Sequence, residues 1–144
     1  MSADILGLDH VQVAAPPGCE TEARRFYGTL LGLEEFDKPP LLAGRGGVWF
    51  RAGAQELHVG VVDPFAPASK AHPALRVRSV EALERLAAHL AEHGCAVSWA
   101  DSDEIPGATR FFVPDPFGNR LEVLARGTRS HVGPDESEFG THPA

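Results

Sequence analysis

Five histidine and glutamate residues carry the side chains with which proteins most often bind divalent metal ions. They are His10, Glu56, His58, His72 and Glu122. Two imidazoles with one or two carboxylates suit Zn²⁺, Ni²⁺, Fe²⁺, Mn²⁺ or Co²⁺. A single histidine in a strand is more often a core or surface residue than a ligand. The sequence therefore predicts a metal site only if the fold brings several of these residues together.

Glu122 lies in a stretch that is typical of two strands joined by a tight turn. Asp115-Pro116-Phe117-Gly118 supplies the turn, because proline presets φ and glycine tolerates a positive φ. In the strand that follows, alternation places Leu121 and Val123 on one face and Glu122 on the other. A lone glutamate in such a strand usually faces water, since burial of an unpaired carboxylate is costly. A cation opposite Glu122 would make its burial favourable.

Hydrophobic periodicity and turn residues divide the chain into two similar units, each with the order β-α-β-β-β. In the first unit we expect strands at 8–14, 33–36, 48–51 and 55–62, with a helix at 20–31. In the second unit we expect strands at 72–78, 96–99, 110–114 and 120–124, with a helix at 80–93. The predicted fold class is α+β, with two βαβββ units at about 5–62 and 70–125 in one domain over residues 1–125. Residues 126–144 have no apolar period, and we expect them to form a flexible C-terminal tail.

This repeat predicts where the candidate ligands lie. His10 and His72, 62 residues apart, fall in the first strand of each unit, and we expect them at equivalent points. The candidates in the last strands are Glu56 and His58 in the first unit and Glu122 in the second. If the two units face each other by pseudo-symmetry, these side chains converge in one cavity. Residues i and i+2 of a strand are about 7 Å apart, so Glu56 and His58 compete for the fourth ligand position.

Several motifs together resemble the vicinal oxygen chelate superfamily, over about residues 5–125. This superfamily includes glyoxalase I, fosfomycin- and bleomycin-resistance proteins, methylmalonyl-CoA epimerase and extradiol dioxygenases. The motifs are Leu8-Asp9-His10-Val11, Phe26-Tyr27, Leu31-Gly32-Leu33, His72-Pro73-Ala74-Leu75-Arg76-Val77 and Asp115-Pro116-Phe117-Gly118-Asn119-Arg120-Leu121-Glu122. The resemblance implies the glyoxalase fold, in which two βαβββ units form a curved mixed sheet around a cavity. It also implies metal ligands from the first and last strands of each unit.

The chemistry implied by the resemblance is chelation of a substrate by the metal through adjacent oxygen atoms. The metal would act as a Lewis acid on an enediolate or oxyanion. Glu56 or Glu122 would be the catalytic group that transfers a proton. We expect the substrate to contact Arg110, Arg120, Trp49 and Phe112, the two arginines by neutralising an anionic group.

Three functions remain open from the sequence. The first is a metal-dependent lyase or isomerase of the glyoxalase type, which acts on a small oxygen-rich metabolite. The second is an extradiol-type dioxygenase, since two histidines and one glutamate also form an Fe(II) site. Against it, Tyr27 is the only tyrosine and lies in the predicted first helix. The third is a metal-free protein that binds a drug or metabolite, like bleomycin-resistance proteins.

Composition excludes other classes of partner. The net charge is −7 and no basic cluster stands out, so we expect neither nucleic acid nor an anionic membrane as a partner. No apolar run is long enough to span a bilayer. Cys19 and Cys95 lie in no metal or redox motif, as expected in a reducing compartment. We therefore expect a cytoplasmic protein, and the resemblance implies a homodimer.

Overall fold

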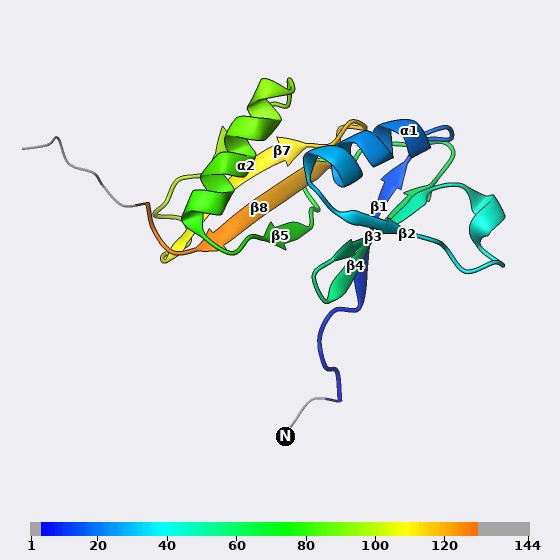
Figure 1. The fold of residues 1–144 in the computed structure, drawn as a ribbon, viewed down its shortest axis with the longest axis horizontal. Coiled ribbons are helices and arrows are strands. Elements are labelled where there is room, and N and C mark those ends of the chain that lie inside the picture. The colour runs from blue at the N-terminus through cyan, green and yellow to red at the C-terminus, as the bar shows by residue number, and fades with distance from the viewer. Residues whose placement is uncertain (1–3, 130–144) are drawn as a thin grey trace, which may run out of the picture.

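The computed structural model describes residues 4–129 and contains two four-stranded sheets (Figure 1). The first unit comprises β1 (His10–Ala15), α1 (Glu20–Ala23), η1 (Arg24–Leu30), β2 (Glu34–Phe36), η2 (Ala43–Arg45), β3 (Val48–Ala52) and β4 (Gln55–Val61). The second unit comprises β5 (Ala74–Arg76), α2 (Val80–Glu92), β6 (Ser98–Trp99), β7 (Ala108–Pro114) and β8 (Arg120–Arg126). The predicted α+β class and its repeated unit are therefore confirmed.

Both sheets have the same topology. Their strand orders are β1-β4-β3-β2 and β5-β8-β7-β6. The first strand of each unit is parallel to the last, and the other neighbours are antiparallel. Because the first and last strands are adjacent, side chains from these two strands meet on one face of each sheet.

Side chains along each strand point alternately to the two sides of the sheet. One side packs against the hydrophobic core, and among the described residues no helix covers the other. Leu57 and Val59 of β4 are buried in the hydrophobic core with residues of η1, whereas Glu56 and His58 point to the opposite face. In β8, Leu121 and Val123 join the core in the same way, and Glu122 takes the other side as predicted. We use "helix-free face" for the side of each sheet that carries Glu56 or Glu122.

Helix α2 covers the core side of the second sheet, as Figure 1 shows. Its N-terminus is capped by Ser79, whose hydroxyl oxygen accepts a hydrogen bond from the backbone N–H of Ala82 at 3.1 Å. Its buried residues are Val80, Leu83, Ala87 and Leu90, at the spacing of one helical face. The predicted helix at 80–93 is thus confirmed to within one residue.

Two elements differ from the sequence-based expectation. The helix predicted at 20–31 is α-helical only in its first turn and then widens into the π-helix η1, where the N–H of Leu31 donates to the carbonyl of Phe26 at 2.9 Å. A hydrophobic stripe does not distinguish these two helix types. Strand β5 begins at Ala74, so His72 precedes the strand instead of opening it. Pro73 has no N–H to donate to a ladder, which explains the later start.

The turn between β7 and β8 joins the second unit to the first. Tyr27 of η1 donates its hydroxyl proton to Asp115 Oδ2 at 2.8 Å, and both residues are buried. Asn119 Nδ2 donates to the carbonyl of Ala14, at the end of β1, at 2.7 Å. The Asp115 carboxylate also accepts hydrogen bonds from the backbone N–H groups of Phe117 and Asn119. This turn therefore fixes how the two units sit relative to each other.

Most of the predicted C-terminal tail, residues 130–144, lies outside the described residues. Strand β8 continues to Arg126, two residues beyond the strand end predicted at 124. Within residues 4–129, no helix is both long enough and apolar enough to cross a membrane.

Candidate functional site

The helix-free face of the first sheet carries three of the predicted ligands. His10 of β1 lies directly opposite Glu56 of β4, and His58 lies opposite Trp49 of β3. The His58 ring is parallel to the Trp49 indole, at 3.7 Å between centroids and an interplanar angle of 3°. On its other side the His10 ring is stacked at 4.3 Å and 16°. The three rings therefore form one stack along this face.

His58 is buried in this stack, with 3% of its surface exposed. Its Nε2 lies 2.9 Å from Glu56 Oε1, within hydrogen-bonding distance. The Glu56 side chain is more open, with a relative exposure of 32% against 4% for the His58 side chain. Of the two candidates for the fourth ligand position, Glu56 is thus the more accessible.

The other two candidate histidines, His10 and His72, each have one ring nitrogen within hydrogen-bonding distance of an oxygen atom. His10 Nδ1 lies 2.7 Å from Asp9 Oδ1, and His72 Nδ1 lies 2.8 Å from the carbonyl oxygen of Lys70. Such partners commonly orient metal-binding histidines, because they fix the tautomer that leaves Nε2 as the free lone pair. His10 and His72 therefore fit a divalent metal ion through Nε2.

The helix-free face of the second sheet carries Glu122, which is 6% exposed. Its Oε1 accepts a hydrogen bond from Arg110 Nη1 at 2.6 Å and lies 3.8 Å from His72 Nε2. Arg110 is also buried, and its second terminal nitrogen donates to Glu104. A guanidinium thus provides the positive partner that the burial of Glu122 requires. Arg110 Nε is buried and has no hydrogen-bond partner in the part of the chain that the structure describes.

Phe112 lies beside these groups on the same face. The Arg120 guanidinium lies over its ring at 3.9 Å from the centroid, and His72 packs edge-on against it at 5.5 Å. Among the described residues, Arg120 makes no ion pair within 4.0 Å. Of the two arginines predicted to bind substrate, Arg120 is therefore the one without a carboxylate partner.

The strand register agrees with the predicted equivalence of the two histidines. Gln12 pairs with His58, and Ala74 pairs with Glu122. His10 lies two residues upstream of Gln12, as His72 lies two residues upstream of Ala74. By the same register, the residue of the first unit that corresponds to Glu122 is His58.

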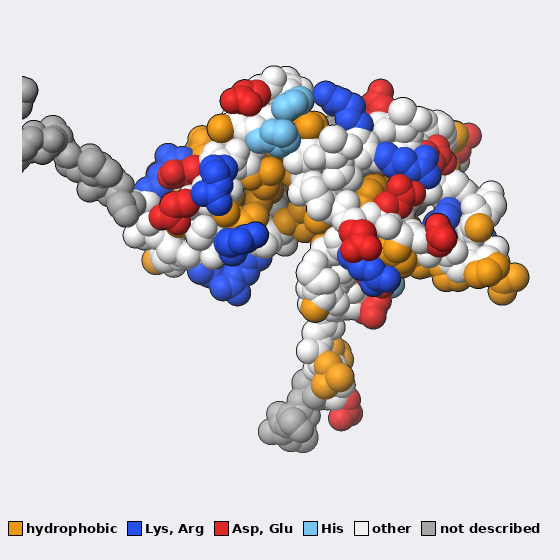
Figure 2. Space-filling model, in the orientation of Figure 1, with side chains coloured by type: hydrophobic (Ala, Val, Ile, Leu, Met, Phe, Trp, Pro, Cys, Tyr) orange, Lys and Arg blue, Asp and Glu red, His pale blue; other side chains and the backbone are white. Residues whose placement is uncertain are grey.

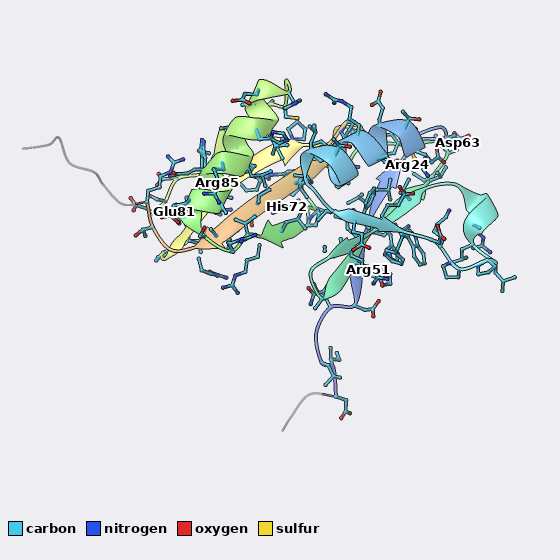
Figure 3. The ribbon with its side chains drawn as sticks, viewed as in Figure 1. Arg24, Arg51, Asp63, His72, Glu81 and Arg85 are labelled. Carbon is cyan, nitrogen blue, oxygen red and sulfur yellow. The ribbon has the colours of Figure 1, made fainter. Side chains whose placement is uncertain are left out.

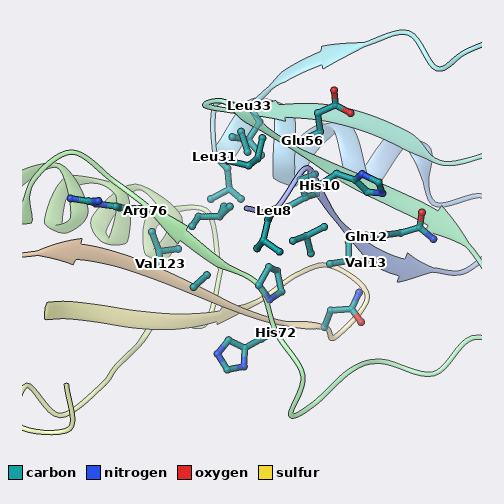
Figure 4. A pocket seen from close by; sticks show the side chains of 18 of the residues that line it. Leu8, His10, Gln12, Val13, Leu31, Leu33, Glu56, His72, Arg76 and Val123 are labelled. Atoms are coloured by element: carbon teal, nitrogen blue, oxygen red, sulfur yellow. The ribbon is translucent and has the colours of Figure 1, made fainter. Parts of the chain in front are cut away.

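A groove of about 1070 Å³ lies between the two units, and His10, Glu56 and His72 are among the residues that line it (Figure 4). Most of its lining is apolar and includes Leu31, Leu33, Leu75, Val77 and Leu86. In Figure 2 hydrophobic side chains are visible at the notch between the units.

The candidate ligands do not converge within one chain. Glu122 and His58 do not line the groove, and Figure 3 shows His72 near β5 while Arg51 of the other helix-free face lies near β3. Within the described part of the chain, no three His, Cys, Asp or Glu side chains are grouped so as to hold a metal ion. The chain therefore presents two separate pairs of candidate ligands, His10 with Glu56 (called half-site A) and His72 with Glu122 (called half-site B).

Comparison with known proteins identifies the family. Residues 7–123 match the Glyoxalase/Bleomycin resistance protein/Dioxygenase superfamily. The chain belongs to this superfamily. The matched range covers the two βαβββ units, and it agrees with the resemblance seen over about residues 5–125. No curated protein matches the sequence.

Solved structures of this superfamily share the fold. A structure assigned to the glyoxalase family from Bacillus anthracis is 48% identical and covers 88% of this chain and 99% of its own, with a TM-score of 0.81. A glyoxalase family protein from Enterococcus faecalis is 26% identical over 83% of this chain and 97% of its own, with a TM-score of 0.61. Lactoylglutathione lyase from Agrobacterium tumefaciens is 18% identical over 85% of this chain and 96% of its own, with a TM-score of 0.66. At 18% identity the likeness shows the fold alone.

Three supporting groups were not singled out as site residues from the sequence. They are the Asp9 carboxylate, the Lys70 carbonyl and the Glu104 carboxylate. The sequence did contain a feature that could have indicated Asp9, since an acidic residue directly before a candidate histidine ligand can reach the Nδ1 atom of that histidine. The other two had none, because Lys70 acts through its backbone and Glu104 comes from a loop.

Proposed function

We propose that this protein is a metal-dependent lyase or isomerase of the glyoxalase type, acting on a small metabolite that chelates the metal through adjacent oxygens. One observation carries the proposal. Each half-site pairs a histidine whose Nδ1 is occupied with a glutamate on the same face. This is the arrangement that leaves Nε2 and a carboxylate oxygen for a divalent ion.

The complete site forms between two copies of the chain in a homodimer. Half-site A of one copy faces half-site B of the other and supplies His10, Glu56, His72 and Glu122 to one ion. The faces are complementary in charge. The second sheet presents Arg76, Arg110 and Arg120 against Glu122, while the first presents Glu34 and Glu56 against Arg51.

The two glutamates have different roles in this proposal. Glu122 is held by a hydrogen bond from the buried Arg110 guanidinium and serves as a fixed ligand. Glu56 is partly exposed, and within residues 4–129 its carboxylate is bonded only to an imidazole, so it is the one that moves a proton to or from the substrate. A bound metal would stabilise the oxyanion that develops during proton transfer. Arg120 and Phe112 contact the substrate on the opposite wall.

Metal analysis of protein purified without chelators tests the proposal. We expect stoichiometric Zn²⁺, Ni²⁺, Fe²⁺, Mn²⁺ or Co²⁺, removal by chelator with a fall in thermal stability, and recovery on adding the ion. His72→Ala should abolish binding, whereas His89→Ala, on the exposed face of α2, should leave it intact. Lactoylglutathione, from the name of the A. tumefaciens relative, is the first compound to assay. Absence of metal binding in the wild type would overturn the proposal.

A second candidate function is supported by the Arg110–Glu122 pair. Because this ion pair neutralises Glu122 without a metal, the face is also compatible with a metal-free protein that binds a drug or metabolite. That function predicts no bound metal and no stabilisation by added ions. The dioxygenase alternative gains no such support, since Tyr27 is buried in the core against Asp115.

A further inference from the structure

We propose that the Nε and Nη2 atoms of Arg110 bind a carboxylate group of the substrate, and that Glu104 occupies this place until the substrate displaces it. The inference deepens the proposed function, because it names a chemical group that the substrate carries. It rests on that function only in taking the helix-free face of the second sheet as one wall of the substrate site.

The buried guanidinium of Arg110 has one donor that is not used. The residue is 9% exposed. Its Nη1 donates to Glu122 Oε1 at 2.6 Å, and its Nη2 donates to Glu104 Oε2. Within residues 4–129, Nε has no hydrogen-bond partner. Because a buried donor without an acceptor is unfavourable, an acceptor placed at this nitrogen would stabilise the protein.

The unused donor lies beside the one that Glu104 uses. Nε and Nη2 are on the same edge of the planar guanidinium, and a carboxylate can accept a hydrogen bond from each of them through its two oxygens. Glu104 accepts from Nη2 alone. A ligand carboxylate that faces this edge would accept both bonds and thus satisfy Nε. A bidentate contact of this kind is stronger and more directional than a single hydrogen bond.

Glu104 is free to leave this position. It belongs to the loop between β6 and β7, in which residues 101–107 are all exposed. Its side chain is 58% exposed, against 10% for the side chain of Arg110. A carboxylate that moves from such a place into water recovers its hydration, so an exposed ion pair of this type contributes little stability. The Glu122 side chain is 8% exposed and stays in place.

The exchange does not change the local charge, because one carboxylate replaces another beside Arg110. Two further arginines on the same face favour an anion. The strand register places Arg76 and Arg110 on either side of Leu124, and Arg120 lies nearby on β8. Among the described residues, neither Arg76 nor Arg120 makes an ion pair within 4.0 Å. The face therefore attracts a negatively charged ligand toward the loop of Glu104.

Phe112 provides an apolar surface beside the proposed carboxylate site. The guanidinium carbon of Arg110 lies 5.3 Å from the centroid of this ring, and that of Arg120 lies 3.9 Å from it. The ring is only partly buried. The carbon body of a ligand bound at Arg110 can thus pack on the ring, so benzoate, which has a carboxylate and a flat apolar body, is a suitable probe.

Titration calorimetry with benzoate on full-length, chelator-treated protein tests the proposal. Glu104→Ala removes the competing carboxylate, so it should bind benzoate about 3- to 10-fold more tightly than the wild type. The matched control is Asp103→Ala, which removes the same charge from the adjacent exposed position and should leave the affinity unchanged. Equal affinities of Glu104→Ala and the wild type, or no binding to either, would overturn the proposal.

Arg110→Lys tests the geometry of the site. Lysine keeps the positive charge beside Glu122 but has no planar pair of donors, so benzoate binding should fall at least about 10-fold. Unchanged binding would rule out Arg110 as the site. If this variant does not fold, the Arg110 Nε–H signal in proton–nitrogen NMR spectra of the wild type decides. Benzoate should move this signal downfield, as a new hydrogen bond to a carboxylate does, and an unmoved signal would contradict the proposal.

Inorganic phosphate, titrated in parallel, tests the class of anion. If Glu104→Ala strengthens phosphate binding more than benzoate binding, the site belongs to a phosphate group and the assignment to a carboxylate is wrong.

These experiments are independent of the proposed metal site, because the protein is free of metal and benzoate meets Arg110 directly. If the wild type binds no metal but benzoate behaves as expected, the proposed function fails and the carboxylate site stands. If metal binds and benzoate does not, this inference alone fails.

Discussion

At the scale of single residues, the two site carboxylates differ in what holds them. Glu122 is bound by the permanently charged Arg110, whereas Glu56 is bound by His58. The sequence predicted that a cation must face Glu122, and it offered a metal ion as that cation. The structure shows that a buried arginine already does so. Alternation revealed the face of Glu122, but its partner sits on another strand, and pairing across strands is not encoded in local spacing.

The Arg110–Glu122 pair leads to a prediction about stability. In Arg110→Met the buried Glu122 loses its charge partner, which should lower the free energy of unfolding by about 3–5 kcal/mol in the absence of metal. A divalent ion restores a positive partner, so excess Zn²⁺ should recover part of this loss. Denaturant unfolding with and without Zn²⁺ measures both effects.

Arg120→Met is the matched control for this experiment. Arg120 lies on the Phe112 ring and has no carboxylate partner within 4.0 Å among the described residues. Its loss should cost far less, and Zn²⁺ should not offset it. Equal losses in the two variants would contradict the proposed charge pairing.

At the scale of elements, the repeat and the helix-free faces were predictable, but two local departures were not. Periodicity located the first helix, yet it could not show that η1 widens into a π-helix at Arg24–Leu30. The late start of β5 could have been predicted from Pro73, because proline has no backbone N–H to donate to the hydrogen bonds between strands. His72 keeps the position equivalent to His10, because each lies two residues before the partner of His58 or Glu122, but Glu122 corresponds to His58 and not to Glu56. Half-site B is therefore not a copy of half-site A.

The contact between η1 and the β7–β8 turn gives a pH prediction. Burial, together with the adjacent carboxylate of Asp115, raises the pKa of Tyr27 above its usual value of about 10. The folded protein thus holds the phenol proton more tightly than the unfolded chain. This contribution to stability is fully present below about pH 10 and declines as the pH rises through the folded-state pKa.

Tyrosinate absorbance measures this effect directly, because Tyr27 is the only tyrosine in the chain. In concentrated urea the tyrosinate signal should be half complete near pH 10. In the native protein it should be absent at that pH and appear only together with alkaline unfolding. A native titration curve that matches the curve in urea would show that Tyr27 is not held against Asp115.

At the scale of the whole molecule, the sequence predicted that the four candidate ligands converge in one cavity, and within one chain they do not. The internal repeat shows which strands carry the ligands, but it does not show how the two units are placed. That placement depends on the contacts of Asp115 and Asn119 with Tyr27 and Ala14, which join residues far apart in sequence. Two half-sites per chain remain, and a second copy is proposed to complete them.

Mixing two defective variants tests this arrangement. His10→Ala removes half-site A and His72→Ala removes half-site B, so each homodimer should bind metal weakly or not at all. In a mixed dimer, one site combines the two damaged halves and the other combines the two intact halves. After unfolding and refolding the mixture, we expect about one strongly bound ion per mixed dimer.

Refolding each variant alone is the control for the mixture. If the ligands all came from one chain, the mixture would bind no more metal than the separate variants. Analytical ultracentrifugation of the same samples should show dimers throughout. Monomers with full metal occupancy would rule out a shared site.

Because Trp49 is stacked on His58, its fluorescence emission should report on changes at the candidate site. The chain has two tryptophans, and the other, Trp99, lies in the second unit under the guanidinium of Arg129. Any compound that draws His10 or Glu56 toward itself must disturb the ring on which the Trp49 indole rests. In a Trp99→Phe variant all of the indole fluorescence would come from this stack. Candidate compounds could then be ranked by the change in emission alone, before any reaction is known.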